Sequence, residues 1–325
     1  MADTRLTTKL PCGTVLRDPL LLASGCCGYG EEYAEIVDPA TYGGVITKAV
    51  SPEPRLGNDT PRLCETPAGL MNCIGLQNPG VQAFIDEIIP RLTARGVSFI
   101  VNAVGHEPDE FADVVMRVDE AVYGGPESNR PGTDGTGVTT GLSGIELDLS
   151  CPNVASGTLF ATDFNLLAET VALCRDASEA FMIAKLSPNV TDIVPYARVA
   201  MENGADAVTI ANTFNGVSIN TRTRRSNVSR PSAGLSGPAI RPAALYHVWR
   251  CHRALPQLPI IASGGITDTE SAVQFLLAGA TALQLGTGLF LNPKLPEEIR
   301  DGLSAWLDDQ PEEMLSEVIG TYRDG

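Results

Sequence analysis

Side chains that could bind or transform a small molecule recur at one kind of position, the end of a short apolar run. Lys48 and Lys185 each close such a run, where an uncompensated charge is costly. A lysine placed there either forms a salt bridge or contacts an anionic or electron-rich ligand. Asp148 closes a third run, and amide or hydroxyl side chains close others. The full set is Ser24, Lys48, Asn102, Asp148, Lys185, Asn212 and Thr213.

A cysteine follows one of these run ends in the segment Ser150-Cys151-Pro152-Asn153. The proline ends the run, and Asn153 offers an amide in the loop. A thiol at Cys151 could act as a nucleophile or a general base, but an ordinary thiol pKa of about 8.5 would require activation. The other seven cysteines lack this setting, so Cys151 is the candidate for catalysis.

Two glycine-rich turns close the last two apolar runs. They contain Gly264-Gly265 and Gly286-Thr287. In barrels of alternating strands and helices, the turns after the seventh and eighth strands commonly bind phosphate through backbone N–H groups. The pair of turns therefore predicts a phosphorylated substrate or a nucleotide-like cofactor.

The elements that must position these groups are eight short β-rich runs, each followed by a helix-like stretch. Several runs are apolar on both faces, as a parallel sheet covered by helices requires. Eight such units predict an α/β fold, the (β/α)8 TIM barrel, with the run ends meeting at one mouth. The runs are Pro19–Ser24, Gly43–Lys48, Ser98–Val104, Gly144–Ser150, Met182–Ser187, Ala207–Thr213, Pro259–Gly265 and Ala282–Gly288.

Apolar spacing predicts helices between these runs. One spans Pro79–Arg95, with Pro90 as a kink or division. A second spans Thr162–Ala177, with Phe164, Leu167, Val171 and Cys174 on its apolar face. A third opens at a capping box, Thr267-Asp268-Thr269-Glu270, runs to Leu277 and stops at Gly279.

Three loop segments have unusual length or composition. The loops 49–78 and 214–237 follow barrel strands at the mouth, where extra length suggests a substrate lid. The Gly-, Thr- and Ser-rich stretch Gly124–Ser143 precedes the fourth strand, so it is expected on the opposite side as a mobile surface insertion. The basic cluster Arg222–Arg230 is either a solvated loop or a contact for an anion or an acidic partner patch.

Composition excludes several classes of function. The chain has 325 residues and a net charge of −16, which excludes nucleic acid as a partner because phosphate backbones need a basic face. No apolar run reaches about 18 residues, so we expect no membrane span. No apolar stretch follows the first residues, so we expect a cytoplasmic protein whose eight cysteines are thiols. Three histidines and no Cys-x-x-Cys pair argue against a metal site.

From about Leu10 to Pro293 the chain resembles class 1 dihydroorotate dehydrogenase, within it the 1B type. Each matching segment is modestly specific, but their order and spacing on eight strands are together strong. The segments are Ala23–Cys26, Thr47–Ala49, Glu65–Pro67, Asn72–Gly80, Ser150–Asn153, Lys185–Asn189, Asn212-Thr213, Gly234–Ile240 and the two glycine turns.

The resemblance implies one FMN-containing barrel over residues 1–325 that oxidises (S)-dihydroorotate to orotate in pyrimidine synthesis. Cys151 would be the general base at C5, while hydride passes from C6 to flavin N5. FMN would contact Ser24, Lys48, Ala49, Asn102, Asp148, Lys185, Ala211, Gly237, Gly264, Gly265, Gly286 and Thr287. The substrate would contact Lys48, Asn72, Cys73, Ile74, Gly75, Leu76, Asp148, Asn153, Asn212 and Thr213.

The resemblance also implies partners. Class 1 members form homodimers, and the 1B type passes electrons to NAD through a separate subunit that carries FAD and a 2Fe–2S cluster. This chain has no cysteine-rich cluster motif and no second nucleotide domain. A 1B-type enzyme would therefore need that subunit as a partner.

Asp148 departs from the family pattern, which has Asn two residues before Ser-Cys-Pro-Asn. An ionised Asp only accepts hydrogen bonds and adds negative charge near a carboxylate substrate. Asp148 is either protonated by burial, paired with Lys185 or Lys48, or matched to another substrate. Two alternatives thus remain: a related FMN oxidoreductase on a dihydropyrimidine-like or specialised substrate, and a non-redox phosphate-binding barrel.

Overall fold

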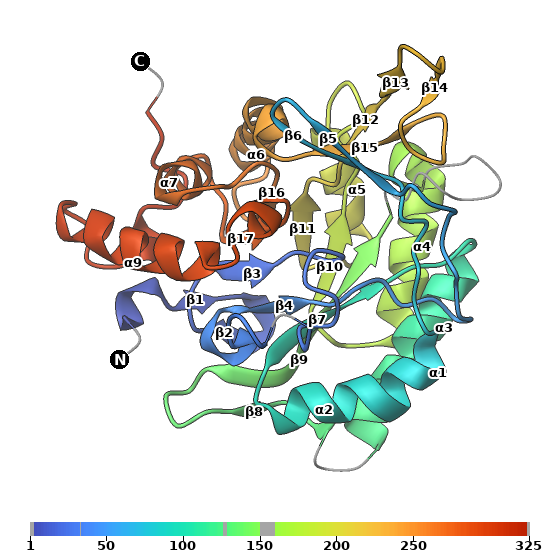
Figure 1. Cartoon of the computed structure of the whole chain (residues 1–325). Coiled ribbons are helices and arrows are strands. Elements are labelled where there is room, and N and C mark those ends of the chain that lie inside the picture. Colours follow the sequence, from blue (N-terminus) through green and yellow to red (C-terminus); the bar gives the residue numbers. More distant parts are fainter. Residues whose placement is uncertain (1–2, 33, 126–128, 150–159, 324–325) are drawn as a thin grey trace.

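The computed structural model describes residues 3–32, 34–125, 129–149 and 160–323. Its centre is a closed barrel of eight parallel strands, ordered β10-β11-β16-β17-β3-β4-β7-β9, with β9 pairing back onto β10 (Figure 1). All eight predicted runs form these strands, and the expected TIM barrel is confirmed. The strands are β3 (Leu20–Leu22), β4 (Gly44–Ile46), β7 (Ser98–Ala103), β9 (Thr139–Asp148), β10 (Met182–Lys185), β11 (Ala207–Ile210), β16 (Ile260–Ser263) and β17 (Ala282–Leu285).

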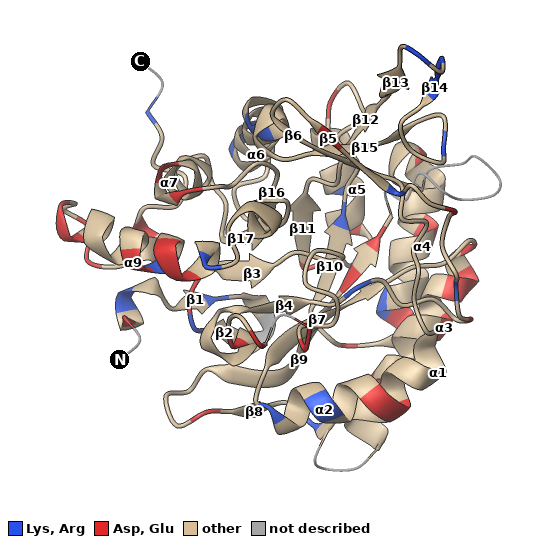
Figure 2. Cartoon of the chain, in the orientation of Figure 1, with Lys and Arg blue, Asp and Glu red and all other residues tan. Residues whose placement is uncertain are grey.

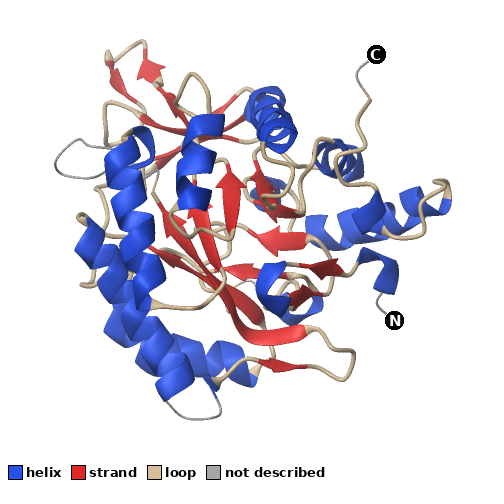
Figure 3. Ribbon diagram, turned by 180° about the vertical axis from the view of Figure 1, so that it is seen from behind, coloured by secondary structure: helices blue, strands red, loops and turns tan. Residues whose placement is uncertain are grey.

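Helices surround the barrel, as the view from behind shows (Figure 3). The large hydrophobic core lies between this helical layer and the outward side chains of the strands. The helices are α1 (Val81–Ala83), α2 (Ile89–Ala94), α3 (Pro108–Asp119), α4 (Phe164–Ala177), α5 (Val194–Glu202), α6 (Arg241–Ala254), α7 (Thr269–Leu277), α8 (Gly288–Leu291) and α9 (Leu295–Asp308). No helix among the described residues is long and apolar enough to cross a membrane.

The barrel interior changes from apolar to polar along the strands. One layer of inward side chains is apolar, and Leu21, Ile46 and Ile261 lie in this buried cluster. Two leucines of the amino-terminal hairpin join this cluster. Leu10 directly follows β1 (Thr8–Lys9), and Leu16 is the last residue of β2 (Val15–Leu16). Because side chains alternate between the two faces of a strand, the residues two positions later also face inward. The inward residues of this next layer, on the strands or just after them, are Ala23, Lys48, Asn102, Glu146, Lys185, Thr209, Ser263 and Gln284.

The two long loops at the mouth pair with each other. They form an antiparallel sheet, β12-β15-β6-β5, in which β6 and β15 join segments more than 160 residues apart, with Leu235 opposite Met71. The two loops expected to form a lid are therefore a four-stranded sheet at the carboxyl ends of the barrel strands, which we call the lid sheet. Its strands are β5 (Leu63–Thr66), β6 (Gly69–Asn72), β12 (Phe214–Gly216) and β15 (Ala233–Ser236).

Part of the Gly124–Ser143 stretch differs from the expected mobile insertion. Thr139 to Ser143 belong to β9, and β8 (Gly132–Thr133) pairs with the start of β9 as an antiparallel hairpin. Arg17 fixes this hairpin through an ion pair with Asp134, with Nη2 2.7 Å from Oδ2. The small and β-branched residues from Thr139 to Ser143 therefore form the first half of strand β9 and are not a free loop.

Three helix details refine the sequence expectations. Pro90 lies in the first turn of α2, and a π-helical segment, Phe84–Ile88, precedes it, so the predicted division is present. The capping box of α7 joins Asp268 to Ser271, one residue later than expected. Phe164 is 46% exposed rather than in the core, and it stacks on Tyr196 with ring centroids 4.3 Å apart.

Candidate active site

A cavity of about 440 Å³ opens at the carboxyl ends of the barrel strands. The barrel contributes the floor, and the β6–β15 sheet contributes part of the wall through Asn72 and Gly234. Eleven of the twelve residues expected at FMN line it, namely Ser24, Lys48, Ala49, Asp148, Lys185, Ala211, Gly237, Gly264, Gly265, Gly286 and Thr287. Of the expected substrate contacts, Lys48, Asn72, Ile74, Gly75, Leu76, Asp148, Asn212 and Thr213 line it as well.

Two expected residues lie outside the cavity wall. Cys73 packs behind the lid sheet in a small cluster with Met71 and Val228, and its sulfur lies 3.5 Å from Ser229 Oγ. Asn102 is wholly buried beneath the floor. Cys151 and Asn153 lie outside the described residues.

The glycine turns after β16 and β17 present backbone at one end of the cavity. Gly264 has φ of 139°, and a Cβ there would lie 2.7 Å from the Ala244 Cβ, so only glycine fits. At Gly286 a Cβ would have 3.6 Å to its nearest protein neighbour, so the space beside this glycine is open to the cavity. Such exposed backbone suits the phosphate of a nucleotide-like cofactor.

A polar network built around Glu146 lies directly beneath the floor, which Lys185 and Gln284 line. Glu146 is fully buried and accepts hydrogen bonds from Asn102 Nδ2 at 2.8 Å and Thr209 Oγ1 at 2.6 Å. Gln284 Nε2 also donates to it, at 2.6 Å. These donors come from β7, β11 and β17, so one carboxylate ties three strands together across the barrel. The run-end pattern of the sequence does not point to Glu146, Thr209 or Gln284, although each lies two residues before a predicted site residue.

Lys185 is the cation of this network. Its Nζ lies 3.5 Å from Glu146 Oε1 and 3.9 Å from Asp148 Oδ2. Burial by itself would lower the pKa of Lys185, but the two carboxylates outweigh it and raise the pKa above its ordinary value. Lys185 is therefore a fixed positive charge at the cavity floor.

Lys48 differs from Lys185 because it has less compensation. Desolvation lowers the pKa of Lys48 from its ordinary value; the charge of Glu32 only partly opposes this, and the charge of Arg62 adds to it. A half-buried ammonium group of this kind gains when an anionic ligand enters the cavity.

Asp148 is held within the protein. Its Oδ1 accepts a hydrogen bond from Asn212 Nδ2 at 3.1 Å, and its Oδ2 faces Lys185. Of the sequence alternatives for this residue, the structure thus supports pairing with Lys185.

Two buried acceptors test whether FMN fits the site. Asn102 Oδ1 and Gln284 Oε1 have no hydrogen-bond partner among the described residues, although each side chain's amide nitrogen is bound to Glu146. Unsatisfied buried acceptors are costly, so a ligand with N–H donors would stabilise this end of the cavity. An isoalloxazine ring has such a donor in its pyrimidine part. The acceptors at the floor, the lysine and the glycine turns therefore fit FMN.

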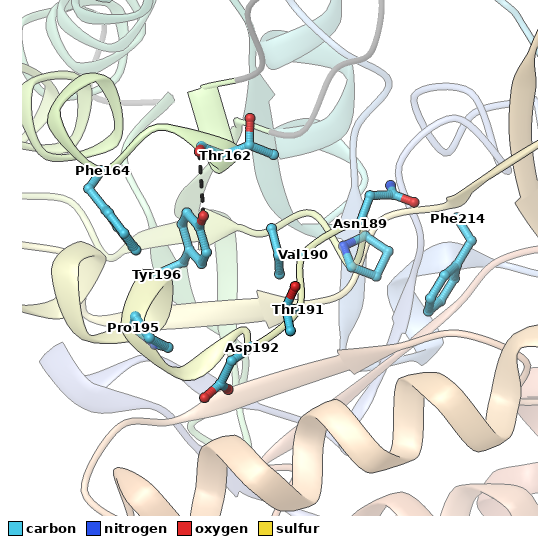
Figure 4. A pocket seen from close by; sticks show the side chains of 10 residues that line it. Thr162, Phe164, Asn189, Val190, Thr191, Asp192, Pro195, Tyr196 and Phe214 are labelled. Carbon is cyan, nitrogen blue, oxygen red and sulfur yellow. Dashed lines mark hydrogen bonds between the residues drawn. The ribbon is translucent and has the colours of Figure 1, made fainter.

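A second hollow of about 620 Å³ lies beside α5 and is shallower (Figure 4). Its wall includes the stacked rings of Phe164 and Tyr196, and the Tyr196 hydroxyl donates to the Thr162 carbonyl at 3.4 Å. Asp192, at its edge, is paired with Arg250. This hollow lacks the convergent charged groups of the barrel mouth.

The basic cluster lies on an arm that projects from the lid, formed by β13 (Ile219–Asn220) and β14 (Arg225–Ser226) (Figure 2). Arg230 differs from the others because its guanidinium donates to Asn58 Oδ1, 2.9 Å from Nε, and so joins the two lid loops. Val217 and Ile219 on the arm are 62% and 63% exposed. The arm therefore combines positive charge with apolar surface.

Known proteins resemble this chain along nearly its whole length. The family model described as dihydroorotate dehydrogenase matches residues 5–124 and 138–307, on either side of the β8 hairpin region. A protein of Pelobacter propionicus, named dihydroorotate dehydrogenase B (NAD+), catalytic subunit, is 42% identical over 309 residues, 95% of each chain. A protein of Trichlorobacter lovleyi with the same name is 42% identical over 306 residues, 94% of each chain.

The fold also matches a solved structure. The dihydroorotate dehydrogenase of Eimeria tenella in complex with ferulenol superposes with a TM-score of 0.79 at 20% identity. That alignment covers 98% of this chain and 89% of the other. At this identity the likeness supports the barrel architecture.

Proposed function

This chain belongs to the dihydroorotate dehydrogenase family, and we propose that it oxidises (S)-dihydroorotate to orotate with FMN, in pyrimidine biosynthesis. One observation carries the proposal: eleven of the twelve residues expected at FMN and eight of the ten expected at the substrate line one cavity at the barrel mouth. The same cavity has buried acceptors, a fixed cation and open glycine backbone, which suit the parts of a flavin nucleotide.

The residues would divide the work by their chemistry. The turns at Gly264 and Gly286 would hold the phosphate, and Gln284 in the cavity wall would accept from the N–H of the pyrimidine part of the flavin, with Asn102 buried behind it. Lys185 would supply positive charge to the flavin ring. FMN, when bound, would accept the hydrogen of substrate C6 together with its two electrons.

The substrate side would rely on Lys48 and the amides around it. Lys48 would attract the carboxylate of dihydroorotate, since the cavity already disfavours its unpaired charge. Asn72 and Asn212 can donate to and accept from the pyrimidine ring. Cys151, three residues after Asp148 in the sequence, would take the proton from C5.

Anaerobic titration of the FMN-loaded protein with dihydroorotate tests the proposal. We expect bleaching of the flavin band near about 450 nm, with one orotate formed for each flavin reduced. A flavin that stays oxidised would favour the alternative suggested by Asp148, an FMN oxidoreductase for another pyrimidine-like substrate. A protein that takes up no FMN would reject both forms.

A partner subunit follows from the same proposal. The relatives are named as NAD+-linked catalytic subunits, and this chain would then pass its electrons through a second subunit that carries FAD and a 2Fe–2S cluster. The chain alone should reduce NAD+ at a negligible rate after reaction with dihydroorotate. Fumarate and a quinone, offered in turn, would identify a different acceptor.

We further propose that residues 1–325 form one FMN domain and that two copies associate. The exposed Val217 and Ile219 and the basic arm are suitable surfaces on a chain whose net charge is −16. Light scattering should give about twice the 34.3 kDa of one chain. A cytoplasmic location is supported by the free thiols of Cys26, Cys27, Cys64, Cys73, Cys174 and Cys251, which suit a reducing compartment.

A further inference from the structure

Two carboxylates share one lysine at the floor of the cavity. Glu146 Oε1 and Asp148 Oδ2 lie 3.5 Å and 3.9 Å from Lys185 Nζ. All three side chains are less than a tenth exposed. With both carboxylates ionised, this group carries one net negative charge, although it contains the cation that faces the flavin site.

Asp148 is the member of the group that sets this balance. Glu146 has three other hydrogen-bond donors from three strands, so its charge is already well compensated. Asp148 instead lines the cavity itself, so its charge faces the ligand space, and its partners include Lys185 and the neutral amide of Asn212. Among the described residues, an Asn at this position would leave Glu146 as the one carboxylate paired with the lysine.

A reduced flavin carries more negative charge than an oxidised one, and this charge lies near N1. A cation nearby stabilises the reduced form, and an added carboxylate weakens that stabilisation by Coulomb repulsion, strongly so in a poorly solvated site. A negative Asp148 therefore favours the oxidised flavin relative to an Asn of the same shape.

We propose that Asp148 lowers the reduction potential of the flavin in this cavity by offsetting the charge of Lys185. This inference rests on the proposed function only in that FMN must occupy the cavity. The consequence is a flavin that gives up its two electrons more readily, which suits a low-potential acceptor of the nicotinamide class. A direct role as a substrate acceptor is less favoured, because both oxygens of Asp148 already face protein donors.

The test compares FMN-loaded wild type with Asp148→Asn, which removes the charge and keeps the shape. Each protein is equilibrated without oxygen against a dye of known potential. We expect the equilibrium constant for two-electron reduction to rise at least about tenfold in the variant, equivalent to about 30 mV. The matched control is Asp301→Asn, which removes the same charge from a side chain 79% exposed on α9 and should leave the constant unchanged.

A second readout separates electrostatics from structural damage. By the thermodynamic cycle, Asp148→Asn should raise the affinity for reduced FMN relative to that for oxidised FMN by the same factor as the equilibrium constant for reduction. Asp148→Ser, which also removes the charge, should shift the potential in the same direction if the Asn variant is poorly folded. A potential equal to that of Asp301→Asn, or lower than wild type, would overturn the inference. Failure of wild type to bind FMN would instead refute the proposed function.

Discussion

The strongest prediction on stability concerns Glu146, the buried carboxylate below the cavity. Glu146→Ala removes the acceptor of three hydrogen bonds, from Asn102, Thr209 and Gln284, at 2.6 to 2.8 Å. It also removes the nearer of the two carboxylates beside Lys185. Each donor left buried without an acceptor costs about 1–3 kcal/mol, and breaking a buried ion pair costs about 3–5 kcal/mol.

These costs are not additive, because they are consequences of losing one group. Asp148 also remains 3.9 Å from the lysine. We therefore expect a loss of about 3–5 kcal/mol in the free energy of unfolding. Glu146→Gln should cost less, because one oxygen remains and the Thr209 hydroxyl can turn to accept from the new amide.

Urea denaturation of the FMN-free protein measures this loss without a contribution from released ligand. The comparison is Asp113→Ala, which breaks a partly exposed pair with Arg117 on α3 and should cost less than about 1 kcal/mol. The slope of free energy against urea should be equal in all variants, so that midpoints report stability. A midpoint for Glu146→Ala no lower than that of Asp113→Ala would refute the structural role assigned to the network.

Three further predictions address the site and the fold. Cys151→Ser should slow flavin reduction by dihydroorotate about 100-fold or more, and unchanged stopped-flow rates would remove Cys151 from the mechanism. Asp148→Asn should tighten orotate binding to the oxidised enzyme about tenfold, measured by flavin spectral titration, because a negative charge near the ligand carboxylate is lost; weaker binding would show that Asp148 serves a different ligand. Burial raises the pKa of Asp18 to about 6, despite hydrogen bonds from the Leu20 and Gly43 amides. A raised carboxyl pKa contributes stability below about pH 4 that is lost as the pH rises through about 6. Between about pH 4 and pH 7, wild type should therefore lose more stability than Asp18→Asn, which has no carboxyl group to titrate at this position. Parallel unfolding midpoints for wild type and Asp18→Asn across this range would contradict that linkage.

Much of the barrel could be predicted because its signal is local. Each strand is a short apolar run with a polar end, and each pattern reflects burial on both faces of a parallel strand. The side chains at the run ends, such as Lys48 and Asn212, line one cavity for this reason. The lid sheet could not be predicted in this way, because the pairing of Met71 with Leu235 depends on two loops that meet only after the barrel closes.

Three members of the polar layer were missed for a different reason. On β9, β11 and β17 the run-end residues lie at the rim, and the inward polar residue is two positions earlier, whereas on β7 and β10 the run-end residues Asn102 and Lys185 already belong to this layer. Glu146 was visible in the sequence as a charge inside an apolar strand, a placement that is costly without partners. Its partners are on strands far away in sequence, so only the register of the closed barrel shows that Asn102, Thr209 and Gln284 converge on it.

This register explains why the floor and the ligand site depend on each other. The amide nitrogens of Asn102 and Gln284 are fixed by Glu146, so their oxygens are left without described partners. A barrel selected for stability alone would gain by replacing such a network with apolar side chains. Glu146 thus orients two acceptors, and holds one lysine, at the level where the flavin ring is proposed to bind. The free energy that these unsatisfied acceptors cost the empty protein would be recovered when a ligand with matching donors enters.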